Sequence, residues 1–314
     1  MIVAIDIGGT FVKIGLVKEA KIICKTFFES ISNIEFSQTM SLIENTIDDI
    51  LLKSNTSKRE LKGIGIGFPG IVDSINMKVL STNKKYDDSI SFNFTEWAKL
   101  KYNVPVFLEN DARVALIGEW KYGAGKEYQN IVMITLGTGV GSAVLMDNRI
   151  LLGKHFQAGN LGGHFTVKMN GAKCTCGNLG CVEAEASTWK LSQLLTSDSR
   201  YPKSNIKGSN LDFESLFKCA AQGDTLSKDI RDYCLEVWSA GIINHIHAFD
   251  PEIVIIGGGI TKSANTIIPF VKNKIKKHAW TPWGEVKIIK SEIPNRSALL
   301  GAYHLVGNNK NKNE

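Results

Sequence analysis

The chain has 314 residues, of which 43% are hydrophobic and 22% are charged, and its formal net charge is +6. This is the composition of an ordinary globular protein with enough apolar residues for a core, and the length favours two domains or one large α/β unit. The basic residues are spread along the chain, and the one basic cluster, 272–277, has the spacing of a solvated helix face, so nucleic-acid binding is not indicated.

No targeting segment or membrane span is expected. The apolar start, residues 1–6, is too short for a signal peptide and has no basic region before it. No apolar stretch reaches the length of a membrane span. Three of the six cysteines fall within eight positions and three are scattered, unlike a secreted disulfide framework. We therefore expect a protein of the reducing cytoplasm.

The first half of the chain opens with a strand, a glycine turn and a second strand. Residues 2–5 are β-prone, Gly8-Gly9-Thr10 is the turn, and 11–17 alternate as in a strand. The next predicted elements are a helix over 37–52, a strand over 63–68, a strand over 105–108 and a helix over 112–120.

The second half opens in the same way. A strand over 131–136, the turn Gly137-Thr138-Gly139 and a strand over 140–145 repeat the first pattern about one domain later. We expect two related α/β halves facing each other across a cleft: residues 1–114, with a C-terminal helix at 297–306 packing back on them, and residues 115–296. Further predictions are helices from about 187 and over 213–248, a strand over 254–256 and a disordered tail over 307–314.

Two of the glycine turns have the residues of phosphate-binding loops. Glycines let backbone N–H groups approach phosphate oxygens, and a hydroxyl can donate a further bond. The first turn is Gly8-Gly9-Thr10, and Asp6 just before it is placed to hold Mg²⁺ directly or through water. The second is Gly137-Thr138-Gly139. The alternative is a pair of plain hairpin turns. A third turn, Gly257-Gly258-Gly259, follows a buried strand and alone could bind nothing.

One carboxylate is a candidate general base. Asp111 follows a predicted strand and precedes a helix, and the carboxyl ends of strands face the ligand crevice in open α/β sheets. Transfer of a phosphoryl group to an alcohol needs a carboxylate that accepts the hydroxyl proton, with Asn110 hydrogen-bonding the acceptor. The alternative is that Asp111 simply caps the helix, and the local sequence does not decide between the two.

The cysteine-rich segment predicts a metal site. Cys174, Cys176 and Cys181 lie in the pattern C-x-C-G-x-x-G-C, and His164 lies ten residues upstream. Three thiolates and one imidazole make a closed tetrahedral zinc site, which is structural and not catalytic. His155 is the alternative fourth ligand, and three free or oxidised cysteines are the alternative to a metal.

These motifs together resemble the ROK family of bacterial sugar kinases and repressors, and its glucokinases and N-acetylmannosamine kinases in particular. The matching segments occur in the family's order over nearly the whole chain: Asp6–Thr10, Gly67–Gly70, Glu109–Ala112, Thr135–Gly141, Cys174–Cys181 with Glu183, and Ile255–Gly259.

The resemblance implies an actin-like ATPase fold of the ribonuclease H-like type, duplicated, with ATP and sugar in the interdomain cleft. It implies Asp111 as the base that accepts the proton when the γ-phosphoryl group of ATP passes to a hexose hydroxyl, most often O6. The ATP contacts would be Gly8, Gly9, Thr10, Gly137, Thr138 and Gly139 at the phosphates and Gly257, Gly258 and Gly259 at the adenosine. The sugar contacts would be Gly70, Asn83, Asn110, Asp111, His164 and Glu183, and the zinc ligands His164, Cys174, Cys176 and Cys181. Homodimers are common in the family.

One segment departs from the family pattern. The family usually has Ala-Gly-Glu-x-Gly-His before the cysteines, where the Glu binds sugar hydroxyls, and here residues 158–164 are Ala-Gly-Asn-Leu-Gly-Gly-His. Asn160 replaces the Glu when the segments are aligned from the left, and Leu161 does so when they are aligned from His164. An anionic hydrogen-bond acceptor worth about 1.5–3 kcal/mol is lost in either case, so the preferred sugar is expected to differ. The charged loop 83–88 is either a site for an acidic or larger sugar or a solvated loop.

Two other functions stay open. A sugar-responsive repressor of the same family would carry an N-terminal helix-turn-helix domain, for which the start of the first loop at Asp6 leaves no room. A sugar-binding protein without catalysis would not need Asp6, Gly9, Thr10 and Asp111 together.

Overall fold

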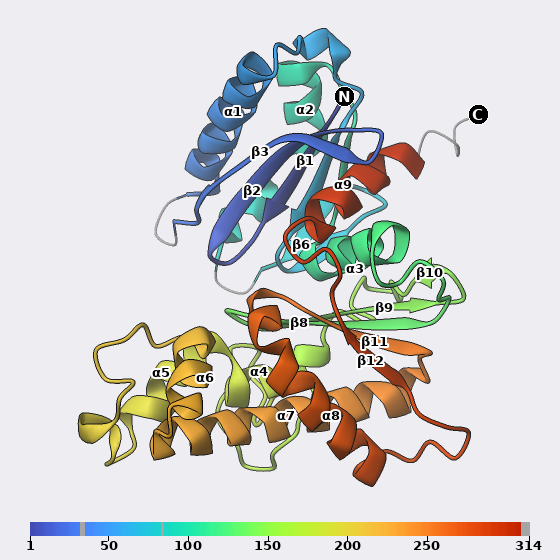
Figure 1. Ribbon diagram of the computed structural model, residues 1–314. Helices are drawn as coiled ribbons and strands as arrows, with labels where there is room; N and C mark the ends of the chain where they lie inside the picture. Colours follow the sequence, from blue (N-terminus) through green and yellow to red (C-terminus); the bar gives the residue numbers. More distant parts are fainter. Residues whose placement is uncertain (32–34, 83–84, 309–314) are drawn as a thin grey trace. The chain divides into compact units, whose positions relative to one another are not determined.

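The computed structural model describes residues 1–31, 35–82 and 85–308, which form two compact units (Figure 1). Unit 1 comprises Met1–Lys126, the segment Leu152–Ala158 and the chain from Asn295 onward. Unit 2 comprises Glu127–Leu151 and Gly159–Pro294. None of the helices in the described ranges is long and apolar enough to cross a membrane.

Unit 1 is built on a five-stranded mixed sheet. Its strands are β3 (Lys21–Glu29), β2 (Phe11–Lys18), β1 (Ile2–Ile7), β4 (Ile64–Phe68) and β7 (Val106–Asn110), in that spatial order. The first three in sequence form an antiparallel meander, whereas β4 and β7 run parallel to β1. Every residue of β1 and β4 is buried, as expected for central strands covered on both faces.

The helices of unit 1 include one contributed by the distant C-terminal part of the chain. They are α1 (Phe36–Lys53), α2 (Phe94–Tyr102), α3 (Asp111–Tyr122) and α9 (Ser297–Asn308), with 3₁₀ turns η1 (Lys58–Glu60) and η2 (Asp87–Ser91) and a small hairpin of β5 (Ile71–Asp73) and β6 (Lys78–Ser81). The last helix packs against α3 (Figure 1). A Cβ on Gly301 would lie 1.8 Å from the carbonyl oxygen of Val114, so the two backbones approach too closely for any side chain there. This contact fixes α3, whose first residue is Asp111.

Unit 2 repeats the sheet of unit 1. Its strands lie in the order β10 (Arg149–Ile150), β9 (Val140–Met146), β8 (Ile131–Leu136), β11 (Ile253–Gly257) and β12 (Lys287–Lys290). Again three antiparallel strands are followed by two that run parallel to the first. The two matching topologies confirm the duplicated α/β fold that the repeated strand, glycine turn and strand predicted.

The helices of unit 2 enclose a second apolar core. They are α4 (Val182–Ala186), α5 (Thr188–Thr196), α6 (Phe213–Ala221), α7 (Thr225–Phe249) and α8 (Ala264–His278), with 3₁₀ turns η3 (Gly162–His164), η4 (Tyr201–Lys203) and η5 (Gly259–Ser263). The helix expected over 213–248 is two helices, because Gly223 has φ +93° and Asp224 caps α7 through its side chain. Cys219 and Cys234 are buried in this core.

Several elements were not expected from the sequence: β3, α2, the hairpin of β5 and β6, and the full length of α8. The polar tail expected over 307–314 is helical at its first two residues, since α9 continues to Asn308. Residues 309–314 lie outside the described residues.

Candidate active site

The polar residues predicted for the first half gather at one edge of the unit 1 sheet. Asp6 pairs in register with Gly67 of β4, which in turn pairs with Glu109 of β7. Because β1, β4 and β7 are parallel, the loops that follow them start at the same edge. The first glycine turn, Gly70 and Asp111 are therefore brought together in unit 1.

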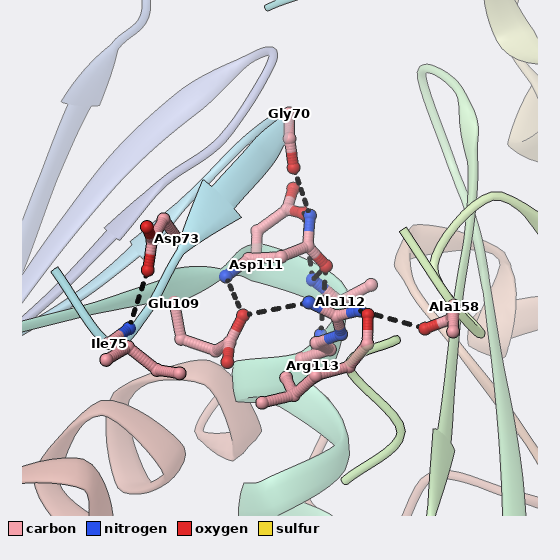
Figure 2. Close-up of polar contacts among 10 residues, drawn as sticks. Gly70, Asp73, Ile75, Glu109, Asp111, Ala112, Arg113 and Ala158 are labelled. Atoms are coloured by element: carbon pink, nitrogen blue, oxygen red, sulfur yellow. Dashed lines mark hydrogen bonds and ion pairs between the residues drawn. The ribbon is translucent and has the colours of Figure 1, made fainter. Parts of the chain in front are cut away.

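Asn110, not Asp111, is the N-cap of α3. Its Oδ1 accepts hydrogen bonds from the backbone N–H groups of Ala112 at 3.1 Å and Arg113 at 3.2 Å. Its Nδ2 donates to the carbonyl of Gly70 at 2.9 Å and to Asp111 Oδ1 at 3.0 Å (Figure 2). The amide thus orients the Asp111 carboxylate, and both its oxygen and its nitrogen make two hydrogen bonds within the protein.

Asp111 is the first residue of α3 and is half-buried. Its Oδ1 accepts the N–H of Ala112 at 2.8 Å. Burial, and then the negative charge of Asp6, raise the pKa of Asp111 to about 7, against the lowering effect of its hydrogen bonds. A carboxyl with a pKa near neutrality is matched to accepting a proton from an alcohol at cellular pH.

The first glycine turn follows Asp6 directly. Gly8 donates its N–H to the carbonyl of Phe11 at 3.0 Å, and a Cβ on Gly8 would lie 2.9 Å from the same oxygen. Gly9 and Thr10 are exposed. Asp6 Oδ2 accepts from Lys13 Nζ at 3.0 Å. No partner for Asp6 Oδ1 is found among the described residues, so one carboxylate oxygen can face a cation.

A buried ion pair lies beneath Asp111, and sequence reasoning did not find it. Arg113 Nη1 lies 3.3 Å from Glu109 Oε1, and Arg113 Nη2 donates to the carbonyl of Ala158 at 2.8 Å (Figure 2). Burial raises the pKa of Glu109, with Arg113 opposing the shift. The i, i+4 spacing of the two charges was the available signal, but it does not show that both are buried.

The second glycine turn, in unit 2, is held by residues that follow Cys181, the last cysteine of the cluster. Glu183 Oε2 accepts the N–H of Val140 at 2.9 Å, and a Cβ on Gly139 would lie 2.4 Å from that oxygen. Thr188 Oγ1 donates to the carbonyl of Gly137 at 2.7 Å. Glu183, expected at the sugar, therefore keeps one carboxylate oxygen on the loop and has the other for a ligand.

The third glycine turn packs against the second. Gly257 of β11 pairs in register with Thr135 of β8. Gly258 has φ +86°, and a Cβ on it would lie 2.3 Å from the carbonyl oxygen of Leu136, so this position is restricted to glycine by the fold. A Cβ on Gly259 would meet nothing within 4 Å, which leaves that position open to a ligand.

The predicted metal ligands converge. His164, Cys174, Cys176 and Cys181 each offer one ligand atom, and the four atoms lie within 4.8 Å of one another. His164 Nδ1 is 3.4 Å from Cys174 Sγ, and Cys176 Sγ is 3.8 Å from Cys181 Sγ. The cluster contains His164 and not His155, so of the two candidate histidines it is His164 that joins the cysteines. These residues can hold a metal ion.

The segment that departs from the family pattern is folded tightly on β9. Ser142 Oγ donates to the carbonyl of Gly159 and accepts the N–H of Gly162, each at 2.8 Å. A Cβ on Gly162 would lie 1.8 Å from His245 Nε2, and one on Gly163 would lie 1.8 Å from the Val140 carbonyl oxygen. Packing therefore explains the paired glycines. Asn160 before them is 8% exposed. Asn83, the remaining predicted sugar contact, lies outside the described residues.

Comparison with known families decides the relationship. The profile of the ROK family matches residues 2–309. The chain belongs to the ROK family. It is 31% identical to a glucokinase of Thermotoga maritima over 313 residues, covering 97% of this chain and 96% of the relative. It is 27% identical to the xylose repressor of Bacillus subtilis over 269 residues, covering 85% of this chain and 67% of the repressor.

Solved structures agree with this placement. The Lmo2764 protein of Listeria monocytogenes, whose name proposes an N-acetylmannosamine kinase, is 25% identical with a TM-score of 0.81, over 98% of this chain and 99% of that one. A ROK glucokinase of Streptomyces griseus, solved with glucose and AMPPNP, is 24% identical with a TM-score of 0.79, over 96% and 98% of the two chains. The predicted family and the actin-like fold of the ROK kinases are confirmed.

Proposed function

We propose that this ROK protein is an ATP-dependent sugar kinase that transfers the γ-phosphoryl group to a hydroxyl, O6, of a hexose or N-acetylhexosamine. The observation that carries the proposal is Asp111, a half-buried carboxyl with its pKa raised to about 7 at the edge of the sheet where the first glycine turn begins. The glucokinase relative, which matches nearly the full length of both chains, supports the same reaction.

Asp111 accepts the proton of the sugar hydroxyl as that oxygen attacks phosphorus. Asn110 holds the carboxylate in place through its 3.0 Å hydrogen bond. Backbone N–H groups of the turns at 8–10 and 137–139 would bind the phosphates, and the turn at 257–259 would lie at the adenosine. Asp6 would hold Mg²⁺ through its unpaired oxygen, and that ion would neutralise phosphate charge.

The four-residue cluster suits a structural zinc ion. Zn–S distances of about 2.3 Å in a tetrahedral site separate two sulfurs by about 3.8 Å, and a sulfur from a nitrogen by slightly less. The distances of 3.8 Å between Cys176 and Cys181 and 3.4 Å between His164 Nδ1 and Cys174 match this geometry. With Nδ1 on the metal, Nε2 of His164 would be free to donate to a sugar hydroxyl, so both roles proposed for this residue are compatible.

The sugar contacts are proposed at Gly70, Asn83, Asn160, His164 and Glu183, with Asn110 acting mainly by orienting Asp111. Asn160 would offer a neutral amide where the family usually has a carboxylate. None of the six cysteines, all of which lie in the described ranges, forms a disulfide, which supports a reducing, cytoplasmic location. A homodimer is proposed from the family alone, and sedimentation equilibrium would measure it.

A substrate panel tests the proposal. Coupled detection of ADP is carried out with hexoses, N-acetylhexosamines and a no-sugar control, and sugar-dependent ADP release is expected for at least one compound. Absence of turnover across the panel would contradict the kinase assignment. Sugar binding combined with DNA binding in a gel-shift assay would favour the repressor function that one relative's name carries.

A further inference from the structure

A lysine from the charged loop lies against the first glycine turn. Lys85 Nζ donates to the carbonyl of Gly9 at 2.6 Å and to the carbonyl of Ser30 at 3.4 Å. Its side chain is half-buried. The sequence alone left two interpretations for this loop, an acidic-sugar site and a solvated surface, and neither predicted contact with the turn at 8–10.

Within the residues that the structure describes, the ammonium of Lys85 has no anionic partner. The ion pairs found among the described residues include one for Lys13 with Asp6 and none for Lys85. Burial lowers the pKa of Lys85, with no carboxylate to oppose the shift. Two neutral carbonyls accept two of its three protons, and the third is available to a ligand. A partly desolvated cation without a counter-ion indicates a place where an anion binds.

The loop that carries Lys85 is built to hold it there. Tyr86 is 5% exposed, has φ 66° and packs its ring 5.6 Å from Phe36 and 6.0 Å from Phe68, centroid to centroid. Its hydroxyl is hydrogen-bonded to Ser30 Oγ. A left-handed backbone at a bulky residue is unfavourable and persists only where the surroundings impose it. The strained, anchored Tyr86 therefore fixes the residue before it.

The neighbourhood of Lys85 suits a phosphoryl group. Gly9 is exposed, its carbonyl accepts from Lys85, and its N–H has no partner in the described part of the chain, so the residue that Lys85 contacts also has an unused donor. The carboxylates of Asp6 and Asp111 repel an anion, and Lys13 neutralises only Asp6. A second cation at the turn would offset that repulsion when a phosphoryl group enters.

We propose that Lys85 is a ligand of the γ-phosphate of ATP at the first glycine turn. The inference rests on the proposed function, since it requires this turn to bind the nucleotide's phosphates. It goes further by naming a residue from outside the glycine turns that distinguishes ATP from ADP. An anionic substituent on the acceptor sugar is the other source of the same chemistry, and the experiment separates the two.

The test compares Lys85→Met with Lys85→Arg. Methionine keeps an apolar side chain of similar length and removes the ammonium group that lies 5.2 Å from the centroid of the Tyr86 ring, whereas arginine keeps the charge. Binding of a non-hydrolysable ATP analogue and of ADP is measured by calorimetry, because binding does not depend on turnover. Lys85→Met is expected to lower the affinity for the ATP analogue about 10- to 100-fold, the range for a charged hydrogen bond. The affinity for ADP is expected to fall less than about twofold. Lys85→Arg is expected to restore most of the loss.

Lys25→Met is the matched control, because Lys25 lies exposed on β3 of the same unit. This variant should bind both nucleotides as the wild type does. Equal affinity of wild type and Lys85→Met for the ATP analogue would overturn the inference. So would a loss confined to the KM of the sugar, which would assign Lys85 to the acceptor. Failure of the proposed function is a separate result: no sugar-dependent turnover by the wild-type protein.

Discussion

The side-chain amide of Asn110 donates a 3.0 Å hydrogen bond to Asp111 Oδ1 while its own oxygen caps α3. The sequence left open whether Asp111 caps α3 or is a candidate general base. This hydrogen bond separates the two roles, because Asn110 is the cap. The helix is capped without a contribution from the second oxygen of Asp111, so that oxygen can face a substrate. It also makes Asn110 a positioning residue, whose removal would loosen both the start of α3 and the Asp111 carboxylate.

Replacement of the proposed base should separate chemistry from binding. Asp111→Asn is expected to lower kcat by about 10²- to 10⁴-fold, the usual contribution of a general base, while the Kd for sugar changes little. Steady-state kinetics and sugar titration measure the two effects. Asp49→Asn, which removes an exposed carboxylate from α1, is the control and should behave as the wild type. Wild-type turnover by Asp111→Asn would show that another group is the base.

The pKa of Asp111 predicts how activity and stability depend on pH. Its raised value, about 7, means that the proposed base is protonated at lower pH, so log kcat/KM should fall with unit slope below about pH 7. Because the folded state favours the neutral carboxyl, its stabilising contribution is complete below pH about 4 and is lost as pH rises through about 7.

A comparison of unfolding free energies checks the sign. Asp111→Asn carries no titrating group, so its stability relative to the wild type should increase between pH 5 and pH 8.5. Denaturant titrations at both values measure the difference. A relative stability that decreases with pH would show that the folded state favours the ionised carboxylate.

The sequence predicted the duplicated sheets because both begin with a strand, a glycine turn and a returning strand, which is a local and strong pattern. It also predicted the metal cluster, since three of its four ligands lie within eight residues. It could not predict that Asn110 caps α3 or that Lys85 reaches Gly9, because both depend on side-chain placement across loops. In the sequence, the extra glycine at 162–163 was only a departure from the family pattern. The structure explains it, because His245 and Val140 leave no room for side chains at these two positions.

The cysteine cluster predicts about one zinc ion per chain. Cys181→Ser removes a buried ligand and is expected to reduce the zinc content towards zero and lower the Tm, because metal binding contributes folding free energy. Elemental analysis and thermal unfolding measure the two effects. Cys24→Ser, outside the cluster, should keep both at the wild-type level. Wild-type protein without metal, purified under reducing conditions without chelator, would refute the site.

The buried pair of Arg113 and Glu109 should be essential for stability. Arg113→Met leaves a carboxylate buried without its partner and is expected to lower the free energy of unfolding by about 3–5 kcal/mol. Adding Glu109→Gln to that variant should recover part of the loss, because the uncompensated charge is removed. Arg200→Met, at an exposed ion pair, should have a far smaller effect. Denaturant unfolding compares the variants, and equal losses in the single and double variants would contradict this account.

Two glycines of unit 2 should respond differently to replacement by alanine: one variant should lose stability, and the other should lose affinity for ATP. A Cβ on Gly162 would lie 1.8 Å from His245 Nε2 and 2.6 Å from Ser142 Oγ, so Gly162→Ala is expected to destabilise the protein by roughly 1–3 kcal/mol through overpacking. A Cβ on Gly137 would meet nothing within 4 Å, so Gly137→Ala should fold normally. It should nevertheless raise the KM for ATP roughly tenfold or more, because the new methyl group would obstruct a hydrogen bond to phosphate. Thermal melts and ATP kinetics on both variants provide the measurement. Unchanged ATP kinetics in Gly137→Ala would mean that this turn is a plain hairpin and that phosphate binds elsewhere.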